Sequence, residues 1–233
     1  MLILGIESSA GPASAAVAQD GRLLGEFFVN TRQTHSQTLL PMVEALLQNL
    51  GLGCKDLDCI AVSNGPGSFT GVRIGVSCVK GLALSHGIAC CGLSTLEVIA
   101  YSGVGLVGSV ICAAMDARCG QIYNAIFEAT PEGLVRLTED RAISIEELGR
   151  ECEHYGRRLM LFGDGAAVCH KEFAAWGAGL APEAVRFQRA GSVALLAEGR
   201  QWISSGELLP AYLRMPQAER ELKAKLKNRE ETK

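Results

Sequence analysis

The sequence lacks the features that mark several whole classes of protein. Its apolar stretches are short and broken by glycine, serine or charge, so none approaches the roughly 20 residues that a membrane helix needs. No basic flank precedes its apolar start and no cleavage-like site follows it, which argues against a signal peptide. No CxxC pair is present, and the four histidines are far apart. We therefore expect a cytoplasmic protein with no membrane segment and no structural metal.

A strong charge of one sign is also absent. The net charge of −3 argues against autonomous nucleic-acid binding, which depends on Lys and Arg neutralising phosphates. The nine cysteines sit in apolar segments, as Cys59, Cys78 and Cys112 do, and not in the pattern of a small disulfide-rich domain. With 48% apolar residues among 233, the chain can build the core of one large or two small α/β domains.

What is present is an order of elements that occurs twice. In each half, an antiparallel meander of strands is followed by alternating helices and strands. In the first half we predict these elements at residues 2–8, 13–18, 22–29, 34–50, 59–63, 68–85, 88–93 and from 95. In the second half we predict them at residues 109–115, 121–129, 134–138, 145–155, 159–162, 166–176, 184–187 and 192–205.

Two such halves are the plan of the actin, hexokinase and Hsp70-like ATPase fold. We therefore predict an α/β protein with two similar lobes, each a mixed sheet flanked by helices. The first lobe is expected over residues 1–106 and a smaller second lobe over 107–215. In the tail, 216–233, Leu222 and Leu226 stand among mostly charged residues, so we expect it to be helical or disordered. Two roles stay open for it: a solvated end, or a contact with a partner or RNA.

The most specific segment is NGPGSFTGVRIG at 64–75, between a predicted strand and a predicted helix. Gly65 and Gly67 permit backbone conformations closed to other residues, and Ser68 or Thr70 can cap the helix. The free N–H groups at the helix start could hold an anion. Two interpretations remain: a tight strand-to-helix connection, which the physics favours, or a vestigial anion loop made of these four residues. The segment is not a P-loop, because GK[ST] is missing.

This segment, the KGLAL that follows it and the PAYLR at 210–214 closely resemble the TsaB family, also called YeaZ. The resemblance covers nearly the whole chain and implies an actin-like fold. It also implies a heterodimer with TsaD, the enzyme that transfers threonylcarbamoyl to the anticodon-adjacent adenosine of tRNA. The ATPase TsaE would join the assembled pair, TsaC would supply the activated adenylate, and tRNA would be contacted only within the complex. The chain itself would be a non-catalytic subunit.

Its resemblance to the TsaD family supports the expectation that it is not an enzyme. The two histidines of the HxxxH metal motif of TsaD fall on Thr95, a poor ligand, and on Ile99, which cannot bind a metal. A glycine-rich turn of TsaD falls where Ala117 and Arg118 should obstruct a phosphate and Asp116 should repel it. We therefore expect no cofactor, with weak anion binding by Arg118 left open. The alternative is a metal-dependent glycoprotease-like hydrolase or an ATP-using enzyme of the same fold.

Three further positions allow two interpretations each. Glu7 ends the first strand, either as a catalytic carboxylate or, as we favour, as a polar residue bonded to the turn at 8–9. The Gly-Asp-Gly at 163–165 is either a vestige of an adenosine-contacting loop or, as we favour, a plain strand-to-helix turn. His35 lies at a helix start, and we expect a cap or surface residue there and not a catalytic base.

The partner surface is predicted on two helices. The helix at 34–50 has an apolar stripe wider than a one-sided core contact, and the helix at 68–85 carries small residues that would let another helix approach. The predicted contact residues are Leu39, Leu40, Met42, Val43, Leu46, Gly71, Arg73, Gly75 and Cys78. The alternative is that the stripe is internal. Without TsaD, we expect the chain to pair with itself through the same helices.

The second helix makes this placement testable. We expect Val72, Val76 and Val79 to face the chain's own sheet and Gly75 to face outward. Replacing Gly75 with leucine would then abolish tRNA modification without unfolding the subunit. Strong destabilisation would instead place Gly75 in the core.

Overall fold

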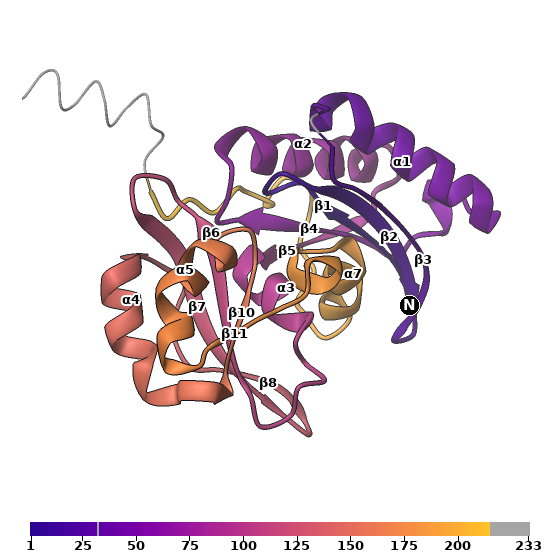
Figure 1. Cartoon of the computed structure of the whole chain (residues 1–233). Helices are drawn as coiled ribbons and strands as arrows, with labels where there is room; N and C mark the ends of the chain where they lie inside the picture. The colour runs from indigo at the N-terminus through magenta and orange to yellow at the C-terminus, as the bar shows by residue number, and fades with distance from the viewer. Residues whose placement is uncertain (32, 215–233) are drawn as a thin grey trace, which may run out of the picture.

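The computed structural model describes residues 1–31 and 33–214, so the tail predicted at 216–233 lies outside the described residues. The chain forms two lobes, each built on a sheet with helices against it (Figure 1). Both sheets combine an antiparallel meander with parallel strands, which confirms the predicted α/β organisation. Within the described ranges, no helix is long and apolar enough to cross a membrane.

The first sheet has the strand order β3-β2-β1-β4-β5. β2 pairs antiparallel with both β1 and β3, whereas β4 and β5 continue the sheet in parallel with β1. A short turn can join antiparallel strands, but a parallel connection needs a crossover, so the helices begin after β3. The strands are β1 (Leu2–Glu7), β2 (Ala13–Gln19), β3 (Arg22–Val29), β4 (Cys59–Gly65) and β5 (Ala89–Ser94).

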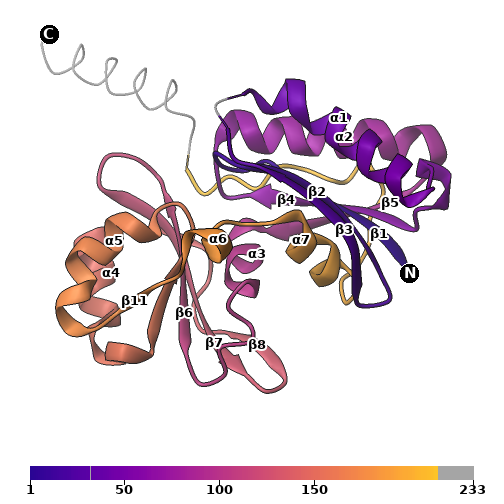
Figure 2. The same cartoon turned by 45° about the vertical axis from the view of Figure 1, so that its right-hand side comes forward.

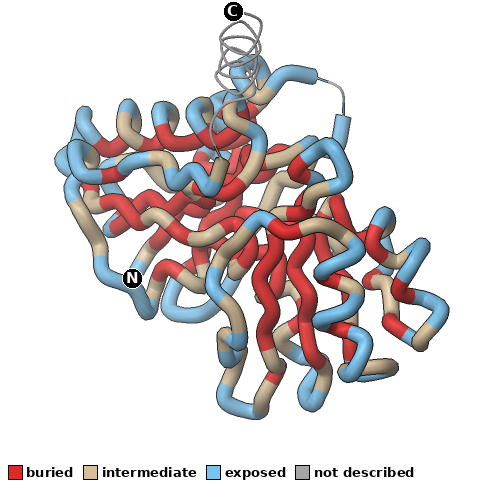
Figure 3. The backbone as a smooth tube through the Cα atoms, turned by 90° about the vertical axis from the view of Figure 1, so that its left-hand side faces the viewer, coloured by how far each residue is buried: buried red, intermediate tan, exposed pale blue. Residues whose placement is uncertain are grey.

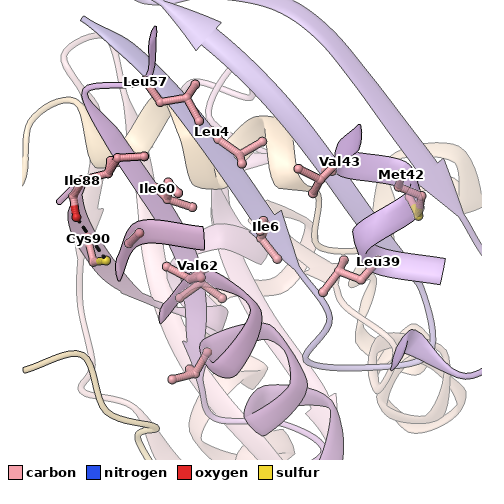
Figure 4. Close-up of a cluster of buried hydrophobic side chains, with 14 of the residues drawn as sticks. Leu4, Ile6, Leu39, Met42, Val43, Leu57, Ile60, Val62, Ile88 and Cys90 are labelled. Carbon is pink, nitrogen blue, oxygen red and sulfur yellow. Dashed lines mark hydrogen bonds between the residues drawn. The ribbon is translucent and has the colours of Figure 1, made fainter. Parts of the chain in front are cut away.

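Two helices, α1 (His35–Leu50) and α2 (Phe69–His86), lie side by side over one face of this sheet (Figures 1 and 2). Each is followed by a glycine with φ of 66°, Gly51 and Gly87, a left-handed conformation that ends helices readily. A short 3-10 turn (η1, Cys54–Asp56) leads from α1 into β4. Helices and sheet enclose a core whose members include Leu4, Ile6, Leu39, Met42, Val43, Ile60 and Val62 (Figure 4).

The opposite face of the first sheet is covered by α3 (Thr95–Tyr101) and α7 (Ala190–Ala197). α7 packs closely on β1 because Gly5 has no side chain: a Cβ there would lie 2.3 Å from the carbonyl oxygen of Ala190. The buried small residues of α7 therefore fit the first sheet. The predicted second lobe, 107–215, needs correction here, because α7 follows the second sheet in sequence but packs on the first.

The second sheet has the order β11-β10-β6-β7-β8, and β9 pairs with β7. Its strands are β6 (Val110–Asp116), β7 (Gln121–Thr130), β8 (Gly133–Arg136), β9 (Arg141–Ser144), β10 (Leu159–Phe162) and β11 (Gly179–Leu180). One face carries α4 (Ile145–Cys152), η2 (Glu153–Arg158), α5 (Ala166–Phe173) and η3 (Ala174–Trp176). The other face packs against α3, which thus lies between the two sheets. The buried residues, red in Figure 3, lie mainly along the strands of the two sheets.

The end of the second half differs from its prediction. The strand predicted at 184–187 is wrong, because the chain forms the short helix α6 (Glu183–Arg186) there. Pro182 precedes this helix with φ of −54°, a value suited to entering a helix. The helix predicted at 192–205 ends at Ala197. Local sequence patterns did not predict β9 and β11. β11 has only two residues, and β9 leads directly into α4 without a turn signal between them.

Candidate docking groove and interlobe cleft

A groove of about 570 Å³ lies between α1 and α2. Among the described residues, its lining includes one permanently charged side chain, Arg73, and no carboxylate. A groove between two helices has a shape that a third helix can fill. The lining residues are His35, Ser36, Leu39, Leu40, Phe69, Thr70, Arg73, Ile74, Ser77 and Cys78.

Three of the predicted contact residues face this groove with accessible side chains. Leu40 is 51% exposed, Arg73 is exposed and Cys78 is half-buried. All three line the groove. They remain our predicted contact residues for a partner.

The other predicted contact residues of α1 lie in the chain's own core. The exposed fractions are 1% for Leu39, 8% for Met42 and 2% for both Val43 and Leu46. α1 contacts β2, β3 and also α2, so the first lobe itself buries most of the apolar stripe. Leu39, Met42 and Val43 lie in this core (Figure 4). These four side chains therefore match the alternative that the stripe is internal, and of the four only Leu39 also forms part of the groove wall.

Gly71 and Gly75 face inward as well. A Cβ on Gly71 would lie 2.2 Å from the carbonyl oxygen of Ser8, and one on Gly75 would lie 2.5 Å from the Ser8 hydroxyl and 3.2 Å from a methyl of Val62. The glycines let α2 approach the end of β1, not a partner helix. The expected outward position of Gly75 is wrong, whereas the predicted burial of Val72, Val76 and Val79 is confirmed.

Residues 203–214, which we call the strap, run from the edge of the first sheet to the start of α2. Ile203 pairs with Cys90 of β5, and the ammonium of Lys80 donates to the carbonyls of Gly206 and Leu208 at 3.4 and 3.1 Å. The amide N–H of Ala211 donates to the backbone carbonyl of Asn64 at 2.7 Å. The PAYLR motif signals this segment in the sequence, but its position on α2 depends on contacts that no local pattern shows.

The strap ends over a cleft of about 490 Å³ between the lobes. Turns from both lobes line this cleft, with Ser9 and Gly11 on one side and Asp116 and Arg118 on the other. The guanidinium of Arg214 donates to the carbonyl of Ala117 at 2.9 Å. The strap therefore connects the first lobe to the hairpin turn of the second.

The predicted anion loop packs tightly on the first turn. The amide of Ser68 donates to the carbonyl of Ser9 at 2.7 Å, and the amide of Gly71 donates to the Ser68 hydroxyl at 3.3 Å, so neither is free for an anion. Gly67, Ser68 and Thr70 line the cleft, whereas Gly65 lies beneath the strap. This arrangement favours the interpretation as a tight strand-to-helix connection.

The second turn is also poorly arranged for a phosphate. Arg118 and Cys119 adopt positive φ angles of 67° and 55°, which non-glycine residues seldom do. The carboxylate of Asp116 accepts the amide N–H of Arg118 at 2.8 Å. It thereby occupies a donor that a phosphate would need, and it adds negative charge beside the cleft.

Glu7 and the Gly-Asp-Gly turn match the interpretations we favoured. Glu7 is fully buried and its carboxylate accepts the amide N–H of Ser9 at 2.6 Å. Burial raises the pKa of Glu7. Gly163 has φ of 101°, and a Cβ there would lie 2.1 Å from the carbonyl of Ala114, which fits a tight turn against β6. Asp164 between the two glycines lines the cleft.

The neighbourhood of Asp164 predicts a dependence of stability on pH. Burial raises its pKa to about 6, and one carboxylate oxygen has no hydrogen-bond partner among the described residues. An acid whose pKa is higher when folded favours folding below its unfolded pKa and loses this contribution as pH rises through the folded value. We therefore expect Asp164→Asn to be more stable than wild type at pH 7, by at most about 3 kcal/mol, with the difference developing between pH 4 and 6.

Urea unfolding at several pH values measures this effect. The exposed Glu132, changed to glutamine, is the control and should leave the pH profile unaltered. An Asp164→Asn profile parallel to wild type would show that Asp164 ionises normally.

The remaining candidates are placed as follows. The Nε2 of His35 donates to the carbonyl of Ala10 at 2.7 Å, so this half-buried ring makes a structural contact and is neither the helix cap nor a fully exposed surface residue. Thr95 and Ile99 are both fully buried on α3 between the sheets. Across residues 1–31 and 33–214, no three His, Cys, Asp or Glu side chains are grouped to hold a metal ion.

Comparison with known proteins finds similarity to two related families of tRNA threonylcarbamoyladenosine proteins, TsaD and TsaB. The family model for TsaD, described as tRNA N6-adenosine threonylcarbamoyltransferase, matches residues 24–175. The tRNA threonylcarbamoyladenosine biosynthesis protein TsaB of Bacillus subtilis is 29% identical over 223 residues, 94% of this chain and 96% of that protein. TsaB of Buchnera aphidicola is 34% identical over 168 residues, 70% of this chain and 79% of that protein.

A solved structure extends the similarity to the fold. It is a Pseudomonas aeruginosa protein described as uncharacterized with similarity to peptidase YEAZ, and it superposes with a TM-score of 0.76 at 26% identity. The match covers 91% of this chain and 99% of that one. Together with the TsaD-family match, it confirms the predicted actin-like ATPase fold.

Proposed function

The chain belongs to the TsaB (YeaZ) family, and from this membership we propose that it serves threonylcarbamoyladenosine biosynthesis as a non-catalytic cytoplasmic subunit that binds TsaD. The observation that carries the proposal is the groove between α1 and α2, with Leu40 and Arg73 accessible on its walls. The bound pair would then be joined by TsaE, and tRNA would be contacted only within the assembly.

The sequence similarity of this chain to the TsaD family supports TsaD as the partner. The TsaD-family match begins within β3 and includes α1 and α2, so a TsaD protein should carry a related helix pair. Two related chains can associate through equivalent faces, as two copies of one chain do around a two-fold axis. We expect the same face to form a homodimer when TsaD is absent.

The cleft supports the non-catalytic part of the proposal. In its first turn, the amide of Ser68 donates to a backbone carbonyl of the chain itself, and in its second turn Asp116 accepts the amide of Arg118. Thr95 and Ile99 are buried. The alternative functions would need other groups here: a metal-dependent hydrolase would need metal ligands at positions 95 and 99, and an ATP-using enzyme would need free N–H groups in the two turns. No observation on the described residues favours either alternative.

The test is association followed by reconstitution. Purified chain and the TsaD protein of the same organism should form a 1:1 complex in sedimentation velocity, with a dissociation constant in the micromolar range or tighter. Modification of tRNA by the complete set of Tsa proteins should stop when this chain is omitted. A chain that modifies tRNA alone, or hydrolyses ATP alone, would contradict the proposal.

A further inference from the structure

Arg73 is held in one geometry before any partner arrives. Its guanidinium carbon lies 3.8 Å from the centre of the Phe69 ring, one helical turn away on α2. Its Nε donates to the hydroxyl of Tyr212 at 2.9 Å, and the Tyr212 ring stacks on Phe69 with centres 4.7 Å apart. The strap therefore orients an arginine of α2, although the two residues are 139 positions apart.

The outer edge of the Arg73 guanidinium remains available. Within the described part of the chain, Nε has an acceptor but the two terminal nitrogens have none, and no carboxylate lines the groove. The two terminal nitrogens form a planar fork that matches the two oxygens of a carboxylate. Fixing a long side chain in advance also removes part of the entropy cost of binding.

We propose that Arg73 is an anchor for a carboxylate of the docked protein, so that the α1–α2 groove accepts a helix with an aspartate or glutamate beside an apolar side chain. The apolar side chain would lie against Leu40 and Ile74, which line the groove. This inference rests on the proposed function and names the chemistry that the partner must present.

A protein helix fits the groove better than nucleic acid does. Nucleic acid requires several cations along a backbone. The described residues of this groove include one arginine on a mainly apolar surface, and the chain carries a net charge of −3. An acidic side chain flanked by apolar ones would pair with the Arg73 guanidinium and pack against the apolar lining residues.

Calorimetry with the TsaD protein of the same organism tests the inference. Arg73→Ala should weaken binding by about 30-fold or more, because it would leave the partner's carboxylate buried and unpaired. Arg73→Lys keeps the charge but loses the fork and the ring contact, so it should weaken binding by about tenfold. Tyr212→Phe removes one hydrogen bond that orients Arg73 and should weaken binding by about threefold. Arg150→Ala, an exposed arginine of α4, is the control and should bind like wild type.

Unfolding midpoints should change little in these variants, because Arg73, Tyr212 and Arg150 are all exposed. The carboxylate itself is found by exchanging partner Asp and Glu residues for Asn and Gln one at a time. One exchange should weaken binding to wild type and have no further effect on Arg73→Ala. If wild type binds, Leu40→Asp weakens binding and Arg73→Ala does not, the anchor is wrong and the docking face stands. If wild type does not bind TsaD, both the proposed function and this inference are wrong. If Arg73 instead binds isolated tRNA, the inference of a carboxylate anchor is wrong.

Discussion

Gly71→Ala will destabilise the protein by about 2 to 3 kcal/mol, although it adds one methyl group. The new Cβ would lie 2.2 Å from the backbone carbonyl oxygen of Ser8, an atom that cannot turn aside as a side chain can. Relief requires α2 to move away from β1, which opens the core beneath Val72 and Val76. The effect appears as a lower midpoint in urea unfolding, with an unchanged slope.

Gly81→Ala on the same helix is the matched control, and it should change stability in the opposite direction. Gly81 is exposed and a Cβ there would meet no atom within 4 Å. Alanine inside a helix is favoured over glycine by about 0.5 to 1 kcal/mol, so this variant should be more stable than wild type. Equal effects of the two substitutions would mean that α2 does not sit closely on β1.

Leu39→Ala and Leu40→Ala, at adjacent positions of α1, should differ sharply in stability. Leu39 is 1% exposed and its truncation leaves a cavity in the core, at a cost of about 3 kcal/mol. Leu40 is 51% exposed, so its truncation should change stability by less than about 0.5 kcal/mol. Thermal or urea unfolding of the isolated chain distinguishes them directly.

In binding to TsaD, substitution of Leu40 should have the larger effect and substitution of Leu39 the smaller one. Under conditions in which both variants are folded, Leu40→Asp should weaken association with TsaD by at least about tenfold, because it places a charge against an apolar contact. Leu39→Ala should bind nearly as wild type does once its folded fraction is taken into account. Full association of Leu40→Asp would remove α1 from the docking face.

Local patterns predicted most of the elements correctly. Alternation and helical periodicity identified the meanders, α1, α2 and the strands of both sheets other than β9 and β11 within a few residues, because these patterns depend on neighbours close in sequence. They failed at 184–187, where Pro182 favours helix entry, and at the very short strands β9 and β11. The motif at 64–75 marked the connection from β4 to α2. Of the residues predicted for the partner surface, Leu40, Arg73 and Cys78 are accessible along the groove.

Which face of an element is buried depends on segments far away in the chain, and only the tertiary structure decided it. The width of the apolar stripe on α1 predicted a contact with a partner in addition to the chain's own core. The contacts of α1 with β2, β3 and α2 instead bury Leu39 and Leu46 within the first lobe. α7 crosses to the first sheet because Gly5 leaves room for it. The Tyr212 contact that fixes Arg73 joins segments 139 residues apart, and no periodicity in either segment encodes it. The sequence by itself therefore determined the order of elements and the family, whereas the long-range packing determined which side chains are left for a partner.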